Sequence, residues 1–245
     1  MSASHEPVTV TTSWDDGHCL DLRLAEILDE YQLPATFYIS SASAEIAPAD
    51  RLSHAGIRSI AERFEIGAHT LTHPRLTSLP VAVARHEIVA GRAHLEDITG
   101  QRVTSFCYPG GAFRPEHVRL VREAGFSYAR TVRRFSLDAG SDSLRSPTTV
   151  QAYRHLVDVS PALAYAGLQP VAAWSLYRHW DRMAMRLFDR VLEVGGVFHL
   201  WGHSWEVDEH SQWGDLQRVC EYIAGRPGVR YLDNGAITKT RGDAI

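Results

Sequence analysis

Short runs of β-branched and aromatic residues alternate along this chain with longer stretches in which apolar residues recur every three or four positions. Runs of the first kind predict β-strands, and stretches of the second kind predict amphipathic α-helices. Seven strands are predicted in this way, at residues 8–14, 35–40, 64–67, 103–107, 127–131, 197–201 and 229–232. Helices are predicted at residues 20–31, 55–63, 80–100, 115–124, 171–194 and 213–224, whereas residues 133–150 are rich in turn-forming residues.

The alternation of strand and helix predicts an α/β fold built on a parallel sheet. Because the sequence has no glycine-rich dinucleotide-binding fingerprint, a closed or nearly closed barrel is favoured over a doubly wound sheet. No linker or internal repeat interrupts residues 1–245, so we expect a single domain. In such barrels the catalytic residues lie at the carboxyl ends of the strands. The residues that directly follow each predicted strand are therefore the candidates for chemistry.

The composition, 44% hydrophobic and 22% charged, is that of an ordinary globular protein. A net charge of −4 gives no basic footprint for nucleic acid. No apolar run reaches the roughly 18 residues of a membrane helix, and the first residues lack the apolar core of a signal peptide. We therefore expect no membrane insertion and a cytoplasmic location. The three cysteines are too few and too far apart to predict a disulfide framework or a structural zinc site.

The first chemical signal is Asp15-Asp16-Gly17, directly after the first predicted strand. Two adjacent carboxylates repel each other and are costly to desolvate, and a bound cation would offset both effects. Gly17 permits a tight turn that can bring both side chains toward one pocket. An ordinary Asp-Gly turn is the simpler interpretation of this tripeptide alone.

The second signal is the pair His69 and His73, which follows the short third strand. Metal sites commonly use two histidines at this spacing. Thr70 stands where a zincin motif requires its catalytic glutamate, so that motif is excluded. Pro74 disfavours helix at His73, so we expect the pair to lie in a turn. Together with Asp16, the two histidines would supply three protein ligands and leave a position open for water, as in catalytic metal sites.

Two further segments follow the fourth and sixth predicted strands. Residues 108–111 read Tyr-Pro-Gly-Gly, which is turn chemistry that also lets backbone N–H groups approach a substrate closely. In the later segment His199, Trp201 and His203 share one face of an extended chain. His199 is best explained as a core residue, whereas His203 lies past the strand end, where chemistry is expected.

These motifs, in this order, resemble the polysaccharide deacetylase family of carbohydrate esterases, which includes chitin and peptidoglycan deacetylases. The matching segments are residues 12–17, 69–73, 108–111 and the segment around His203. The resemblance extends from about residue 8 to residue 232 and implies a distorted seven-stranded (β/α) barrel. It also implies a hydrolase of carbon–nitrogen bonds other than peptides, which removes the acetyl group of an N-acetylated sugar.

The resemblance also implies residue roles. Asp16, His69 and His73 would bind a divalent metal, usually zinc. Asp15 would be the general base and His203 the general acid. A backbone oxyanion donor is expected at Gly110, with Tyr108 and Trp205 as further candidates for substrate contact.

The chain departs from the family pattern at two positions. Cys107 stands where the family usually has an arginine that orients the catalytic aspartate, and Arg130 or Arg145 is a candidate to replace it. His18 stands where the family usually has proline, and substrate contact is one explanation for it.

Three alternative functions remain open on the sequence alone. The same chemistry could act on a small non-sugar amide such as a ureide or cyclic amide. A non-haem iron oxygenase also uses two histidines and one carboxylate, although the second aspartate and His203 speak against it. A catalytically inactive sugar-binding module would have no need of Asp15. Because the expected location is cytoplasmic, we expect the substrate to be a soluble or lipid-linked precursor bearing an N-acetyl sugar.

Overall fold

The computed structural model describes residues 7–237. Within them, eight strands form one parallel sheet. Their bounds are β1 Thr9–Asp16, β2 Ala35–Ile39, β3 Glu65–Ala68, β4 Ser105–Cys107, β5 Tyr128–Arg130, β6 Val150–Gln151, β7 Val197–Gly202 and β8 Arg230–Tyr231.

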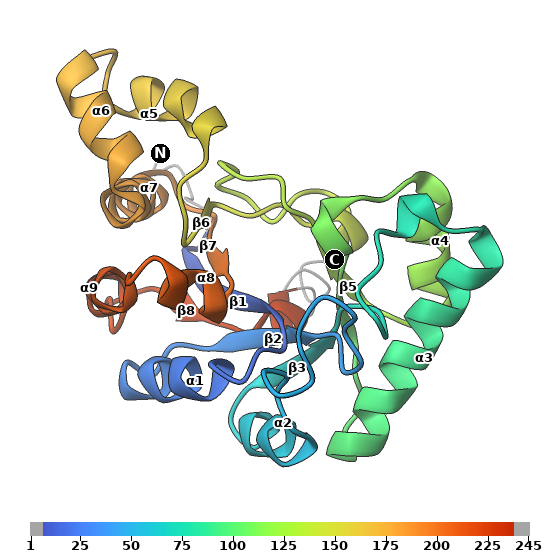
Figure 1. Ribbon diagram of the computed structural model, residues 1–245. Coiled ribbons are helices and arrows are strands. Elements are labelled where there is room, and N and C mark those ends of the chain that lie inside the picture. Colours follow the sequence, from blue (N-terminus) through green and yellow to red (C-terminus); the bar gives the residue numbers. More distant parts are fainter. Residues whose placement is uncertain (1–6, 238–245) are drawn as a thin grey trace.

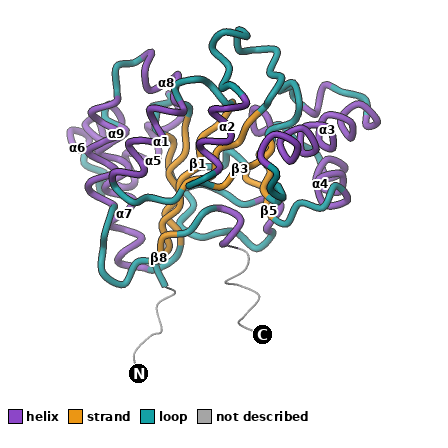
Figure 2. The backbone as a smooth tube through the Cα atoms, turned by 90° about the horizontal axis from the view of Figure 1, so that it is seen from below, coloured by secondary structure: helices purple, strands orange, loops and turns teal. Residues whose placement is uncertain are grey.

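The α-helices among the described residues are α1 Asp21–Glu30, α2 His54–Ala61, α3 Val81–Thr99, α4 Pro115–Glu123, α5 Val159–Tyr165, α6 Pro170–Arg178, α7 Trp180–Val194, α8 Ser204–Glu209 and α9 Trp213–Ile223. Short 3₁₀ turns are η1 Leu76–Ser78, η2 Pro109–Gly111, η3 Ser143–Arg145 and η4 Leu156–Asp158. The helices flank the strands on the outside (Figures 1 and 2). None of the described helices is long and apolar enough to cross a bilayer.

The strand order is β5-β4-β3-β2-β1-β7-β6, and β8 pairs with the first residues of β1. Seven parallel strands therefore curl into the distorted barrel that the sequence predicts. No ladder joins β5 to β6 in the part of the chain described. Instead, the irregular segment between them crosses the gap, and the N–H of Thr131 donates to the carbonyl oxygen of Ser146 at 2.9 Å.

The strand side chains and the inner faces of the helices form one apolar core. Every residue of β1 is buried, and so is every residue of β2. The largest apolar side chains without solvent exposure are Trp14, Phe37, Phe106, Phe188 and Phe198. Burial on all sides explains why these strands read as nearly continuous β-branched and aromatic runs in the sequence.

Residues 150–210 differ from the sequence prediction. Strand β6 and helices α5 and α8 were not predicted, and the helix predicted at residues 171–194 is two helices, α6 and α7. His179 separates these two helices because its backbone is extended, with φ −125° and ψ 93°. The missed elements have two to seven residues, too few to display a helical or strand period.

Candidate active site

Asp15 and Asp16 form the carboxyl end of β1, where the strand leaves the sheet. Asp16 has φ 84° and Gly17 has φ 79°, so the chain turns through two successive left-handed residues. A Cβ on Gly17 would lie 2.7 Å from Cγ2 of Ile39, so this close turn requires glycine. The turn gives the two neighbouring carboxylates different surroundings.

His69 and His73 directly follow β3. They lie in a turn and not in a helix, as Pro74 predicts. Thr70 and His73 both have positive φ, 66° and 67°. These unusual backbone angles bring two side chains four residues apart onto one side of the loop, with their ring centroids 4.7 Å apart.

Helix α3 holds this histidine loop in place. The buried carboxylate of Glu87 accepts hydrogen bonds from the backbone N–H groups of Leu71 at 3.1 Å and Thr72 at 2.9 Å. Gly91, one turn further along α3, lets the loop approach, because a Cβ there would lie 2.5 Å from the carbonyl carbon of Thr70. Nothing near Glu87 in the sequence marks it as a partner of this loop, because the contact arises only from the fold.

Asp16 and the two histidines converge. Oδ1 of Asp16 is 3.2 Å from Nε2 of His73 and 3.6 Å from Nε2 of His69, and the two Nε2 atoms are 3.1 Å apart. Nδ1 of His69 lies 2.8 Å from the carbonyl oxygen of Cys107, and Nδ1 of His73 lies 2.7 Å from the carboxylate of Glu45. These acceptors favour the tautomer with the proton on Nδ1, which leaves both Nε2 lone pairs directed at Asp16.

This donor set fits a divalent metal ion. Oδ1 of Asp16 is buried and has no hydrogen-bond partner among the described residues. Two imidazole lone pairs and a carboxylate oxygen repel one another at these distances unless a cation lies between them. Imidazole nitrogen and carboxylate oxygen are ligands that zinc accepts, and three protein ligands leave one position open.

A second group, Asp15, His69 and Cys107, also brings three potential ligand atoms together. It fits a cation less well for two reasons. Burial raises the pKa of the Cys107 thiol far above its usual value, so the thiolate is disfavoured. Asp15 already has a permanent cation as its partner, since Nη2 of Arg130 pairs with its Oδ2. A metal ion here would meet the guanidinium charge.

Arg130 and Asp15 form an ion pair in the interior of the barrel, and the Arg130 side chain has no solvent exposure. Arg130 is the register partner of Cys107 across the β4–β5 ladder, which places its guanidinium beside Asp15. Burial alone would raise the pKa of Asp15, but the charges of Arg130 and the nearby histidines outweigh burial and lower it. Asp15 is therefore held as a carboxylate.

Arg145, the other candidate for orienting Asp15, lies elsewhere. Its side chain is 55% exposed and its Nε pairs with the carboxylate of Asp142 at 2.7 Å. Of the two candidates for an arginine that orients Asp15 in place of residue 107, only Arg130 contacts Asp15. The structure places Arg145 at the surface, paired with Asp142 and not with Asp15.

His199 and His18 have structural partners. His199 is buried, and its Nε2 lies 2.8 Å from Oγ of Ser13. Burial and the Arg130 charge lower the pKa of His199 well below its usual value, so it is a neutral core residue. His18 follows the Asp-Gly turn, where its Nδ1 accepts the backbone N–H of Leu20 at 3.2 Å and so stabilises the entry to α1.

His203 lies between β7 and α8, facing the aspartates. Its Nδ1 is 3.1 Å from Oε2 of Glu206, and its Nε2 is 3.9 Å from Oδ2 of Asp16. Burial alone would lower the pKa of His203, but the hydrogen bond to Glu206 and the charges of Asp16 and Asp15 outweigh burial and raise it to about 9. His203 is therefore held as an imidazolium at neutral pH, with Nε2–H directed into the site.

The Tyr-Pro-Gly-Gly segment forms η2 after β4. The N–H of Gly110 lies in the first turn of η2, where amides lack an acceptor within the helix, and Gly110 lines the same cleft as the aspartates. The Tyr108 side chain is fully buried: its hydroxyl donates to the carbonyl of Leu144 at 2.9 Å and its ring stacks on Phe113. The structure thus places the Tyr108 side chain in the core, and it is not among the residues that line the cleft.

Trp205 lies at the edge of the site, where its Nε1–H donates to Oδ2 of Asp16 at 2.9 Å. Its ring is tilted against that of His203, with centroids 5.2 Å apart. The hydrogen bond leaves Oδ1 of Asp16 for the two histidines. Trp205 thus contacts the candidate metal ligand as well as lining the cleft.

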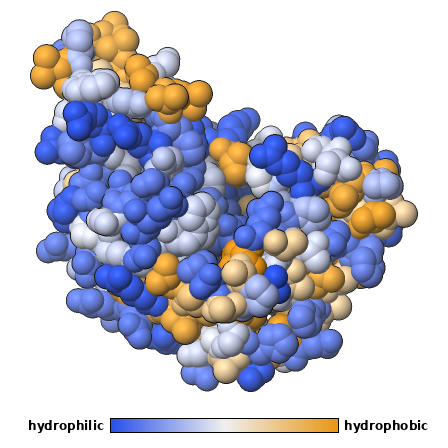
Figure 3. All heavy atoms as spheres, in the orientation of Figure 1, coloured by the Kyte–Doolittle hydropathy of each residue, from blue (hydrophilic) through white to orange (hydrophobic). Residues whose placement is uncertain are grey.

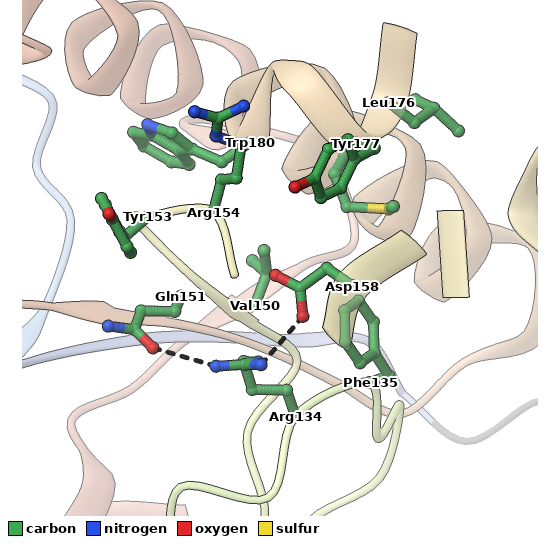
Figure 4. Close-up of a pocket in the computed structure, with 11 residues that line it drawn as sticks. Arg134, Phe135, Val150, Gln151, Tyr153, Arg154, Asp158, Leu176, Tyr177 and Trp180 are labelled. Atoms are coloured by element: carbon green, nitrogen blue, oxygen red, sulfur yellow. Dashed lines mark hydrogen bonds and ion pairs between the residues drawn. The ribbon is translucent and has the colours of Figure 1, made fainter. Parts of the chain in front are cut away.

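These residues line a cleft of about 350 Å³ at the carboxyl ends of the strands. Six lining residues were not predicted from the sequence, namely Glu45, Val132, Arg134, Gln151, His155 and Glu206. A smaller cavity beside the cleft shares Arg134 and Gln151 with it (Figure 4). Arg134 donates to Gln151 at 3.2 Å and to Asp158 at 2.8 Å, so it forms the wall between the two spaces.

The barrel and its cleft define a class of protein: a (β/α) barrel with two histidines and one aspartate brought together at the strand ends. The polysaccharide deacetylase family model matches residues 3–129, which contain Asp15, Asp16, His69 and His73. That match covers more than half of the chain, and the chain belongs to the polysaccharide deacetylase family. Membership implies a hydrolase that acts on carbon–nitrogen bonds of acetylated carbohydrate.

Solved structures share the fold at low sequence identity. A protein from Mycobacterium smegmatis named as a candidate polysaccharide deacetylase is 21% identical, with a TM-score of 0.68 over 100% of this chain and 94% of that one. A deacetylase from Streptococcus pyogenes, solved with acetate, is 19% identical, with a TM-score of 0.53 over 64% of this chain and 69% of that one. A pseudoenzyme of carbohydrate esterase family 4 from Bacillus anthracis is 18% identical, with a TM-score of 0.53 over 96% of this chain and 65% of that one. The fold therefore occurs both in a protein named as a deacetylase and in one named as a pseudoenzyme, so the fold alone does not establish activity.

Proposed function

We propose that this chain is a metal-dependent deacetylase that hydrolyses the acetamide of an N-acetylated sugar. The observation that carries the proposal is the contrast between Asp15 and Asp16 at one strand end. Asp15 pairs with the cation Arg130, whereas Asp16 has a buried oxygen without a partner that faces two imidazoles. Two adjacent carboxylates in such different surroundings are suited to two roles, a base and a metal ligand.

Asp16, His69 and His73 would hold the metal, which we propose to be zinc. When bound, it would polarise the acetyl carbonyl and lower the pKa of water from 15.7 toward roughly 7. Both imidazoles can bind the metal through Nε2, because their Nδ1–H groups donate to the carbonyl oxygen of Cys107 and the carboxylate of Glu45. Trp205 fixes the remaining oxygen of Asp16.

Asp15 would take the proton of the attacking water at Oδ1, since Oδ2 is occupied by Arg130. A positioned base of this kind contributes typically about 10²–10⁴-fold to the rate. The N–H of Gly110 would donate to the negative charge that develops on the carbonyl oxygen, and one such donor is worth on the order of 10²–10³-fold. His203 would donate its Nε2 proton to the departing sugar nitrogen.

The proposal is tested by acetate release from purified protein. The metal is stripped with a chelator, and then zinc, cobalt or manganese is added back before incubation with N-acetylated oligosaccharides and nucleotide sugars. Release that requires metal and gives a free amine supports the proposal. Small ureides and cyclic amides are included as competing substrates, and turnover of these alone would overturn the sugar assignment. Turnover that requires oxygen or another redox cosubstrate would identify an oxygenase.

A further inference from the structure

The hairpin of α5 and α6 projects from the barrel at the upper left of Figure 1. In the same orientation, orange apolar spheres gather on this projection in Figure 3. We define the hairpin surface as the large apolar residues exposed there: Leu156, Val157, Val159, Leu163, Leu168, Val171 and Trp174. The two most exposed, Val171 and Leu156, have relative exposures of 86% and 84%. Contiguous exposed apolar residues of this kind mark an interaction site on a folded protein.

The sequence of the hairpin is unlike that of a solvated helix pair. Residues 159–177 contain no Asp, Glu, Lys or Arg. A surface helix of a globular protein ordinarily carries charged residues on the face that meets water. This part of α5 and α6 therefore lacks the charged face that a solvated helix pair ordinarily carries.

Four arginines lie beside the hairpin and contact its residues. The guanidinium of Arg154 lies 5.6 Å from the Tyr177 ring and that of Arg178 lies 5.9 Å from the Trp174 ring. The other two are Arg182, which donates to Ser175, and Arg186, which donates to the carbonyl of Tyr165. No carboxylate among the described residues forms an ion pair with any of the four. This basic rim is local, since the whole chain has a net charge of −4.

We propose that the hairpin surface docks on a membrane that contains anionic phospholipid, with the apolar residues entering the boundary between headgroups and acyl chains. A projecting aliphatic surface can insert into a lipid bilayer, because the lipids rearrange around it. Aromatic residues such as Trp174 and Tyr177, and arginines such as the four beside the hairpin, are the residue types that occur at the headgroup level of a membrane. Arginines without a carboxylate partner gain electrostatic attraction from anionic lipid near the membrane surface. A second copy is disfavoured as the partner, because a two-fold contact would bring two arginine rims together.

Docking in this way would place the cleft beside the lipid surface. His155 lines the cleft and directly precedes Leu156 of the hairpin surface. Arg134 and Gln151 line both the cleft and the cavity whose other wall is α6 (Figure 4). If the proposed deacetylase function holds, the substrate class that suits this arrangement is an N-acetylated sugar carried on a lipid. Docking itself does not depend on that function.

Flotation of the purified chain with vesicles tests the docking. We expect the protein to float with vesicles of phosphatidylglycerol and phosphatidylcholine, less in high salt, and not with phosphatidylcholine alone. The double variant Leu168→Glu, Val171→Glu should lose flotation. Its matched control is Val83→Glu, Val89→Glu, which places the same charges on exposed valines of α3 and should float normally. Reversal of two rim charges, Arg178→Glu with Arg182→Glu, should weaken binding about tenfold or more.

The proposal would be overturned by no flotation, by equal flotation with uncharged vesicles, or by equal loss in the α3 control. A concentration-dependent dimer in sedimentation that the hairpin variant abolishes would also overturn it, in favour of a second copy. Acetate release from a soluble N-acetylated sugar is measured in parallel. Normal release without flotation rejects docking alone, and flotation without release rejects the proposed function alone.

Discussion

Replacing Arg130 with Met should separate the role of the buried cation from that of simple packing. Methionine retains much of the length and apolar stem of the side chain but removes its charge. Asp15 would then be a buried carboxylate without its cation, because both side chains of the pair are almost fully enclosed. Removing one partner of a buried ion pair typically costs about 3–5 kcal/mol of folding stability.

The same change should impair catalysis in a way that depends on pH. In the wild type, Arg130 helps to lower the pKa of Asp15, so the base stays ionised as the pH falls. Without Arg130 the pKa of Asp15 rises, and the acidic limb of the kcat/KM profile should move to higher pH. At neutral pH we expect a rate loss of roughly 10²-fold, at the lower end of what a positioned base contributes.

Arg145→Met is the matched control, since it makes the identical replacement at the other arginine. The exposed Arg145 pairs only with the half-buried Asp142, so stability should change by about 0.5 kcal/mol or less and the pH profile should keep its shape. Urea unfolding at pH 7 and the pH dependence of acetate release are the two measurements. If Arg130→Met fails to fold, the swap Cys107→Arg, Arg130→Met returns a cation from the facing strand and should recover folding. Wild-type stability and an unmoved acidic limb in Arg130→Met would refute the reasoning.

Four further predictions concern the site. His73→Ala should lose its metal in elemental analysis along with its activity; full occupancy in this variant would place the metal elsewhere. Asp15→Asn should keep its metal but lower kcat about 10²–10⁴-fold, because the change removes a base and not a ligand; near-normal kcat would show that the base is another residue. Glu206→Gln should lower the pKa of His203 from about 9, because its strongest favourable partner is neutralised, so the basic limb of the rate profile should move to lower pH; an unmoved limb would reject His203 as the acid. Trp205→Phe keeps an aromatic face but loses the hydrogen bond to the ligand carboxylate; metal affinity should fall with KM little changed, and a raised KM at full metal loading would instead indicate stacking on the sugar.

Long strands were predictable from the sequence and short elements were not. Strands β1 and β7 have eight and six residues, enough for their composition to identify them. Strand β6 has two residues at the end of a turn-rich segment, and its pairing with β7 comes from tertiary contact alone. The curled parallel sheet could still be predicted, because its strands and helices alternate regularly over most of the chain.

In the site, residues adjacent in sequence were found and their distant partners were not. Asp15 with Asp16 and His69 with His73 form local patterns, whereas Glu45 and Glu206 acquire their roles only through the fold. The sequence leaves both Arg130 and Arg145 as candidates for the arginine beside Asp15, but the predicted strands favour Arg130. Arg130 falls on a predicted strand next to the strand of Cys107, and residues on neighbouring parallel strands meet in register.

The backbone at Asp16 links the local sequence to the chemistry. Successive side chains of a regular strand point to opposite faces, so two adjacent aspartates would not serve one cleft. Asp16 departs from that pattern by adopting φ 84°, a conformation that costs a non-glycine residue roughly 1–3 kcal/mol. The hydrogen bond from Trp205 supports the resulting orientation, and we infer that metal binding by Asp16 offsets the remaining cost. The strained turn thus allows Asp15, the proposed base paired with Arg130, and Asp16, the proposed metal ligand facing two histidines, to be consecutive residues of one strand.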